Sequence, residues 1–381
     1  MIWACSDDPV SVAESDPDPS SLQEEFETLV PQLMADNNVP GVAVGLIADG
    51  EVVLKKGFGL ADVESERAVT TQTAFNVGEL STMLTGWGVL YLVDEGRMDL
   101  EDPVEIHLGG WNFPPSTFDH RKVTLERLLR HKGGTSLDTY PGFPPGSALP
   151  TVQESLSGAT NGAGDVRIVY APGSRTQYSG GGMTVLQLAI DRTVAINFLS
   201  YRTHVEESIF RPLGIVSSRF VVTPALSNVL ATPYDEAGAP IEQRIFKAHA
   251  AAGLMTTVDD MVTFARSLIS IHHGKSFPIP GFNRASMIRL LRLARDPAPA
   301  YEFGHQVRLV GNVSIAGQIG GSEGWSAHFQ VDPEHKNAIV VLTNSSNGGA
   351  VHNALVCRWI EEVAGFTSAE FCLLESNQAS I

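Results

Sequence analysis

Residues 75–104 read FNVGELSTMLTGWGVLYLVDEGRMDLEDPV. The stretch 80–94 contains apolar and small residues on all sides, which predicts a buried helix. The Asp, Gly and Pro residues that follow are typical of a loop. Glu79 stands directly before the predicted helix, so its carboxylate is expected at the positive end of the helix dipole.

Strands are predicted on both sides of this central stretch. Before it, a helix is predicted at 22–37 and two strands at 42–47 and 52–54, joined by the Ala48-Asp49-Gly50 turn. After it, strands are predicted at 306–310, 312–316, 326–331 and 338–343, and a closing helix at 351–363. Strands at both ends with helices between them indicate an α+β fold.

The middle of the chain is predicted to be helical with long connections. Helices are expected at 124–131, 184–196, 205–212 and 258–270. Residues 141–171 are rich in Pro, Gly, Ser and Thr and are expected to form a long irregular loop. Loops of this length are commonly lids or pocket walls.

Composition limits the classes of partner. The chain of 381 residues is 43% hydrophobic and 18% charged, which predicts a sizeable folded core. A net charge of −17 argues against nucleic acid and against an anionic membrane surface as partners, since both require clustered Lys and Arg. No apolar run is long enough to span a bilayer, and no His, Cys or acidic spacing predicts a metal or other cofactor.

The N-terminus resembles the end of a bacterial lipoprotein signal, with Cys5 as the residue that would carry the lipid. Residues 1–21 would then be a flexible tether of an exported, periplasmic or membrane-tethered protein. A basic n-region and a long apolar segment are both absent, so a cytoplasmic location is the alternative. In an oxidising compartment Cys357 and Cys372 could pair, whereas Cys357 could equally be a small core residue.

Several further motifs occur in a consistent order. They are GFGLAD at 57–62, LLRHKGG at 128–134, PGSRTQYSG at 172–180, IFRPLG at 209–214 and GQIGGSEGW at 317–325. Together with 75–104, they resemble the serine β-lactamase and penicillin-binding protein superfamily, in particular its class C β-lactamase, D-alanyl-D-alanine carboxypeptidase and esterase branch.

The resemblance implies a β-lactamase/transpeptidase-like fold. In that fold an antiparallel sheet is built from both chain ends, is flanked by helices and carries an inserted all-helical domain. The expected division is 1–21 as the tether, 22–75 and 290–370 as the sheet domain, and 76–289 as the mainly helical domain.

The catalytic positions of that family are largely changed here. The family uses a Ser nucleophile, a Lys one turn later and a Tyr as second base. Here Glu79 stands at the Ser position and Thr82 at the Lys position, while Tyr178 is retained. The family's Asn is Gly180, and the Lys or His of its third motif is Gln318.

Glu79 has two interpretations. As a buried carboxylate beside Tyr178, its pKa would be raised and it could transfer protons. As a helix-start residue, it would only interact with the helix dipole, which lowers the pKa.

Other candidates are weaker. Ser81 faces a different side of the helix from Glu79, and Ser322 lies in a formal Gly-x-Ser-x-Gly match without the required strand-to-helix elbow. Gly320 and Ser322 are expected at the pocket rim, and His249 near the site as a ligand contact.

Three functions follow. The first is a non-hydrolytic pseudoenzyme or binding module with a small-molecule cleft and a protein partner as a further option. The second is a repurposed isomerase, cyclase or lyase that uses Glu79 and Tyr178. The third is a serine hydrolase or esterase with a relocated nucleophile.

Overall fold

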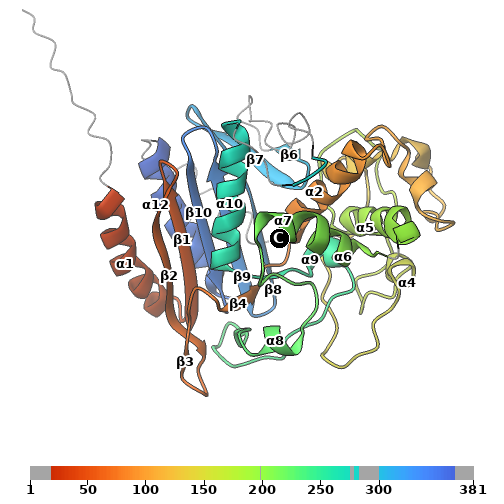
Figure 1. The fold of residues 1–381 in the computed structure, drawn as a ribbon. Coiled ribbons are helices and arrows are strands. Elements are labelled where there is room, and N and C mark those ends of the chain that lie inside the picture. Colours follow the sequence, from red (N-terminus) through yellow and green to blue (C-terminus); the bar gives the residue numbers. More distant parts are fainter. Residues whose placement is uncertain (1–18, 198, 275–278, 283–299, 365–381) are drawn as a thin grey trace, which may run out of the picture.

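A computed structural model describes residues 19–197, 199–274, 279–282 and 300–364. Its centre is an eight-stranded antiparallel sheet with the order β3-β2-β1-β10-β9-β8-β7-β6 (Figure 1). The strands are β1 (Gly41–Ala48), β2 (Glu51–Asp62), β3 (Arg67–Ala68), β6 (Ala300–Glu302), β7 (His305–Val310), β8 (Val313–Ser322), β9 (Trp325–Asp332) and β10 (Asn337–Thr343). Two short strands, β4 (Ala74–Asn76) and β5 (Met255–Thr257), pair separately.

The two ends of the chain meet in the middle of the sheet. Strand β1 pairs with β10, with Val44 opposite Val341. Along β1, Val44 packs in one hydrophobic cluster and Ala43 in another, because successive side chains point to opposite faces. The predicted α+β fold with a sheet built from both chain ends is confirmed, whereas the domain boundaries stay a prediction.

Helices cover both faces of the sheet (Figure 1). Helices α1 (Pro19–Asp36) and α12 (Gly348–Ala364) pack on one face, where Phe26 and Trp359 are fully buried. Helix α10 (Val258–His272) packs on the other face through Val262 and Phe264. Burial of such side chains stabilises the fold by roughly 1.5–3 kcal/mol each.

The helical part is built around α2 (Ser81–Asp94), whose side chains are buried on nearly all sides. Trp87 of α2 packs against Phe264 of α10, with ring centroids 5.0 Å apart. Helix α5 (Gly180–Val194) begins at Ser179, whose hydroxyl accepts the N–H of Gly182. The shorter elements are η1 (Val104–His107), η2 (His120–Lys122), α3 (Leu125–Leu129), α4 (Val152–Leu156), η3 (Ala195–Asn197), α6 (Tyr201–Val205), η4 (Glu206–Phe210), α7 (Arg211–Leu213), α8 (Pro224–Ser227) and α9 (His249–Ala252).

Two local predictions were wrong. The segment 141–171 is not wholly irregular, because Thr151 and Glu154 form a capping box that starts α4. Strand β2 extends well beyond the predicted 52–54. Its continuation contains Gly57, where a Cβ would lie 2.3 Å from the carbonyl oxygen of Val69, so the close packing requires a glycine. Because glycine is uncommon in strands, this residue interrupts the sequence pattern of the strand.

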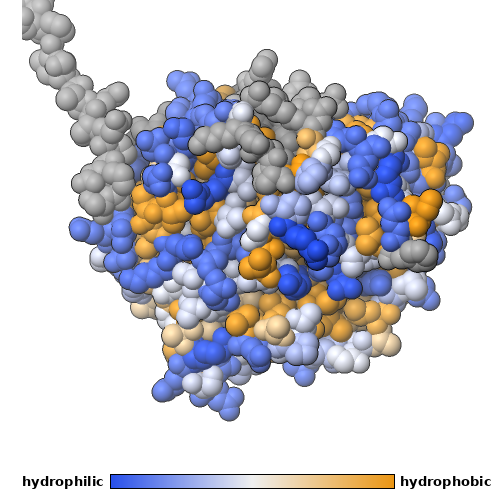
Figure 2. Space-filling view, in the orientation of Figure 1, coloured by the Kyte–Doolittle hydropathy of each residue, from blue (hydrophilic) through white to orange (hydrophobic). Residues whose placement is uncertain are grey.

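The surface, the helices and the cysteines each add one observation. On the face shown in Figure 2, hydrophobic residues are interspersed with hydrophilic ones. None of the helices in the described part of the chain is both long and apolar enough to cross a bilayer. Cys357 on α12 is disulfide-bonded, and both Cys5 and Cys372 lie outside the described residues.

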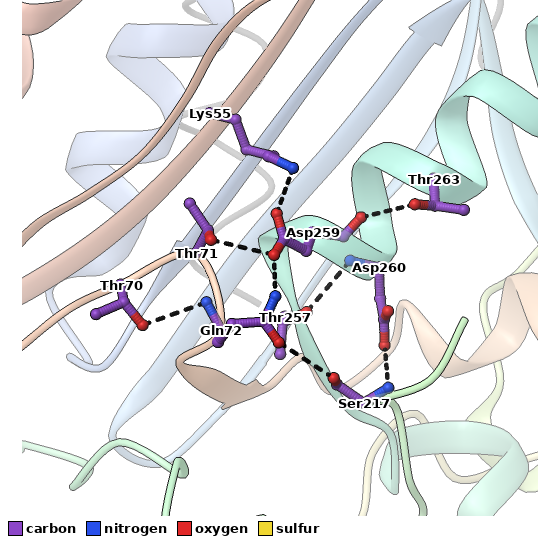
Figure 3. Close-up of polar contacts among 9 residues, drawn as sticks. All are labelled: Lys55, Thr70, Thr71, Gln72, Ser217, Thr257, Asp259, Asp260 and Thr263. Atoms are coloured by element: carbon purple, nitrogen blue, oxygen red, sulfur yellow. Dashed lines mark hydrogen bonds and ion pairs between the residues drawn. The ribbon is translucent and has the colours of Figure 1, made fainter. Parts of the chain in front are cut away.

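The start of α10 is attached to the sheet through Asp259 (Figure 3). Its carboxylate lies 2.5 Å from the ammonium of Lys55 on β2. The same carboxylate accepts hydrogen bonds from Thr71, at 3.1 Å, and from Gln72. The contact therefore joins β2, the loop before β4 and α10.

The neighbouring Asp260 is buried and fixes a different segment (Figure 3). Its carboxylate accepts the backbone N–H groups of Val216 and Ser217, at 3.3 and 2.9 Å, and the hydroxyl of Ser218 at 2.8 Å. Its own N–H donates to the hydroxyl of Thr257 at 3.2 Å, which caps the helix.

Replacement of Asp260 tests this attachment. Asp260→Ala leaves two N–H groups and one hydroxyl without their acceptor, so the free energy of unfolding should fall by about 2–4 kcal/mol. Urea denaturation measures the change. Glu207→Ala is the control, because the Glu207 side chain is 47% exposed and its contact with Arg211 is a surface ion pair. Equal effects of the two substitutions would contradict the assignment.

Candidate active site

Residue 79 lies in the turn that leads into α2, and β8 passes directly over it. A Cβ on Gly320 would lie 2.7 Å from the backbone nitrogen of Glu79. A Cβ on Gly78 would lie 2.5 Å from the backbone nitrogen of Gly321. Both distances are too short for a real side chain, so these glycines allow the strand and the turn to approach each other.

The Glu79 carboxylate is held by the backbone at this crossing. Its Oε2 accepts the N–H of Gly321 at 2.8 Å, and the N–H of Glu79 itself also acts as a donor to the carboxylate. Its Oε1 accepts only a longer hydrogen bond, of 3.3 Å, from the Thr139 hydroxyl. Burial raises the pKa of Glu79, and these hydrogen bonds oppose the rise.

Thr82 and Gln318 interact directly. The Thr82 hydroxyl lies 2.8 Å from the carbonyl oxygens of both Glu79 and Gly304. The amide of Gln318 donates to the same hydroxyl at 3.2 Å. Thr82 and Gln318, which stand where the similar family has basic residues, therefore form a neutral hydrogen-bonded pair.

The hydroxyl of Ser81 is used in hydrogen bonds to the backbone. Ser81 is fully buried, its hydroxyl donates to the carbonyl of Gly78 at 2.6 Å, and it accepts the N–H of Leu254 at 3.0 Å. Ser322 is partly exposed, and its hydroxyl donates to Asn76 at 3.1 Å. Neither serine has a basic side chain as hydrogen-bond partner among the described residues, so neither is set up as a nucleophile.

The Tyr178 hydroxyl is buried with no hydrogen-bond partner among the described residues. Burial raises the pKa of Tyr178 well above its usual value, and the charge of Glu79 raises it further. The Tyr178 ring lies 4.5 Å from that of His131 and 5.9 Å from that of Tyr301, centroid to centroid. Burial also lowers the pKa of His131 to about 3, so its ring is neutral.

Gly180 provides space for a loop. A Cβ at this position would lie 2.6 Å from the carbonyl oxygen of Asp138, which accepts the N–H of Gly180 at 3.0 Å. The hydroxyl of Ser179 and the N–H of Gly181 donate to the carbonyls of Ser136 and Leu137, each at 2.8 Å. The segment 136–140 is therefore fixed across the start of α5 and carries Thr139 to Glu79.

His249 is partly exposed at the start of α9 and packs against Phe220, with ring centroids 5.7 Å apart. Burial lowers its pKa to about 3. No hydrogen bond or ring contact joins it to Glu79 or Tyr178 in the described part of the chain. Its role as a ligand contact stays a prediction.

Sequence reasoning missed Thr139, Asp138, Tyr140 and Tyr301. Thr139 bonds to Glu79, Asp138 and Tyr140 influence the titration of Tyr178, and Tyr301 packs near the Tyr178 ring. These residues lie on loops or an edge strand that carry no motif of their own. Among the described residues, no group of three or more His, Cys, Asp or Glu side chains could hold a metal ion.

The raised pKa of Glu79 predicts a specific pH dependence. A carboxyl group whose pKa is raised by folding stabilises the protein below its unfolded pKa, and this contribution is lost as the pH rises through the folded pKa. The free energy of unfolding of the wild type relative to Glu79→Gln should therefore fall as the pH rises above about 4.5 and then level off. Denaturation at a series of pH values measures this difference.

Glu154→Gln is the control, because its stability difference from the wild type should change with pH in the opposite direction. Hydrogen bonds from Thr151 lower the pKa of Glu154, so its contribution to stability is lost as the pH falls through the folded pKa. Relative to this variant the wild type should gain stability with rising pH. If the stability of the wild type relative to both variants changed with pH in the same direction, the environment described for Glu79 would be wrong.

Comparisons with known proteins agree with the fold. The family model described as Beta-lactamase matches residues 26–356. A β-lactamase of Lysobacter lactamgenus is 24% identical over 357 residues, which cover 86% of this chain and 88% of that protein. Protein flp of Staphylococcus aureus is 23% identical over 223 residues, which cover 57% of this chain but only 42% of flp.

A solved structure shows the same fold. The octameric penicillin-binding protein homologue from Pyrococcus abyssi superposes with a TM-score of 0.69 and 23% identity, covering 87% of this chain and 76% of that one. At this identity the likeness establishes the fold alone. With most of its length matched by the family model, the chain belongs to the Beta-lactamase family.

Proposed function

We propose that this protein is a non-hydrolytic member of its family, a pseudoenzyme that retains a small-molecule binding site. The observation that carries the proposal is the position of the Glu79 carboxylate, which accepts the N–H groups of Gly321 and of Glu79 itself. Two converging backbone N–H groups beside a nucleophile are the arrangement that stabilises an oxyanion in acyl transfer. In this chain the donors are already occupied by the carboxyl group of Glu79.

The residues around Glu79 support the same conclusion. Acyl transfer needs a nucleophile and a base within hydrogen-bond reach. Thr82 and Gln318 are bonded to each other, and neither is basic. Loss of one member of such a unit removes most of the rate, and here the nucleophile and its lysine are both replaced.

Acid–base catalysis by Glu79 and Tyr178 is the second candidate. The raised pKa of Glu79 and the buried hydroxyl of Tyr178 favour it. Against it, no hydrogen bond joins the two side chains in the described structure, and Glu79 Oε2 is held by the backbone. A serine hydrolase with a relocated nucleophile has less support, since Ser81 and Ser322 are bonded to backbone and amide groups.

Export is proposed for the chain as well. The disulfide bond at Cys357 supports an oxidising compartment, and the sequence around Cys5 is compatible with a lipid anchor. Fractionation of the producing cells tests this: the protein should separate from a cytoplasmic marker, and co-fractionation with that marker would contradict export.

Covalent labelling tests the loss of acyl transfer. Wild-type protein incubated with nitrocefin or a p-nitrophenyl ester should show no adduct by intact mass and no turnover above background. An active serine β-lactamase is the positive control. The double variant Glu79→Ser with Thr82→Lys frees both N–H donors and restores the nucleophile pair, so activity gained by it would show that the cleft is open to the substrate. An adduct or turnover in the wild type would contradict the proposal.

A further inference from the structure

The site around Glu79 combines anionic and aromatic groups without a basic side chain at its centre. Among the described residues, no Lys or Arg side chain forms a hydrogen bond with Glu79 or shifts its pKa. Burial keeps His131 neutral, since its pKa is lowered to about 3. Arg244 is paired with Glu323, the neighbour of Ser322 in the chain, at 3.3 Å.

Two hydrogen-bond acceptors of the site have unused capacity. Glu79 Oε1 receives only the 3.3 Å hydrogen bond from Thr139, although a carboxylate oxygen can accept two. The buried Tyr178 hydroxyl has no partner among the described residues. A buried polar group without a partner is costly, so a ligand that donates hydrogen bonds to it gains affinity.

Aromatic rings lie next to these acceptors. The rings of Tyr178 and Tyr301 are 5.9 Å apart, and His131 lies 4.5 Å from each of them. The faces of such rings attract organic cations. Arg308 acts on Tyr301 electrostatically from the same side of the sheet, since Tyr301 pairs with Gln306 and Arg308 donates to Gln306 at 2.6 Å. The Tyr178 ring is therefore the more favourable of the two for a cation.

We propose that this site binds an organic cation, with a primary ammonium group that donates to Glu79 Oε1 and to the Tyr178 hydroxyl and lies against the Tyr178 ring. The inference rests on the proposed function, because it assigns the ligand class of the same non-hydrolytic site. The replacement of both basic family positions by Thr82 and Gln318 reverses the charge preference of the site. Carboxylate ligands would be repelled by Glu79.

Binding of matched probes tests the ligand class. Benzylammonium, benzyl alcohol and benzoate share one ring and differ in the charge of the attached group. Calorimetry or ligand-observed NMR with the full chain, at mildly alkaline pH so that Glu79 is ionised, should detect benzylammonium only. Binding of benzoate with equal or higher affinity would overturn the inference.

Substitutions assign the binding to this site. Glu79→Gln keeps the shape and removes the charge, so the affinity for benzylammonium should fall at least about tenfold. Tyr178→Phe keeps the ring and removes the hydroxyl, so a loss of about three- to tenfold is expected. Glu154→Gln, on an exposed helix start, removes one carboxylate elsewhere and should leave the affinity unchanged.

The outcomes separate the two proposals. Unchanged affinity in Glu79→Gln with its fold intact by circular dichroism, or no binding of benzylammonium by the wild type, overturns the ligand class. Neither result bears on acyl transfer, which is tested by the mass of the nitrocefin-treated protein. A nitrocefin adduct overturns the proposed function, whether or not benzylammonium binds.

Discussion

The close approach of β8 to the turn before α2 is the constraint on which the site depends. Side chains at Gly78 or Gly320 would collide with the opposing backbone. Without them, the N–H groups of residue 79 and Gly321 converge on whatever side chain residue 79 carries. The sheet, α2 and α10 position these two segments, and the attachment of α10 through Asp259 and Asp260 keeps the helical part against the sheet.

Each changed catalytic position has a local structural partner. Thr82 bonds to Gly304 and receives the Gln318 amide, and Gly180 leaves room for the backbone of Asp138. The hydroxyl of Thr82 and the amide of Gln318 therefore satisfy each other at the positions where the family has basic residues. The retained Tyr178 hydroxyl, in contrast, is buried without a hydrogen-bond partner among the described residues.

The sequence predicted the fold well because strand alternation and the order of several motifs survive at low identity. It also identified Glu79, Thr82, Tyr178 and Gln318 as neighbours, because their motifs fix them in the fold. It did not predict Thr139 or Tyr301, since these residues reach the site through tertiary contacts across many residues of chain. Nor could it show that the Glu79 carboxylate lies on the N–H groups, because that depends on the separation of two backbones.

The Glu79 side chain has a further consequence. From its Cα, the carboxyl carbon is three bonds away, the same number that separates Cα from the carbonyl carbon of an acylated serine. With Oε2 on the Gly321 N–H, the side chain is therefore an isostere of an acyl-serine ester that water cannot cleave. The Glu79 carboxyl group therefore lies where the carbonyl group of an acyl-serine would accept the same N–H. A substrate carbonyl could use the Gly321 N–H only by displacing this side chain.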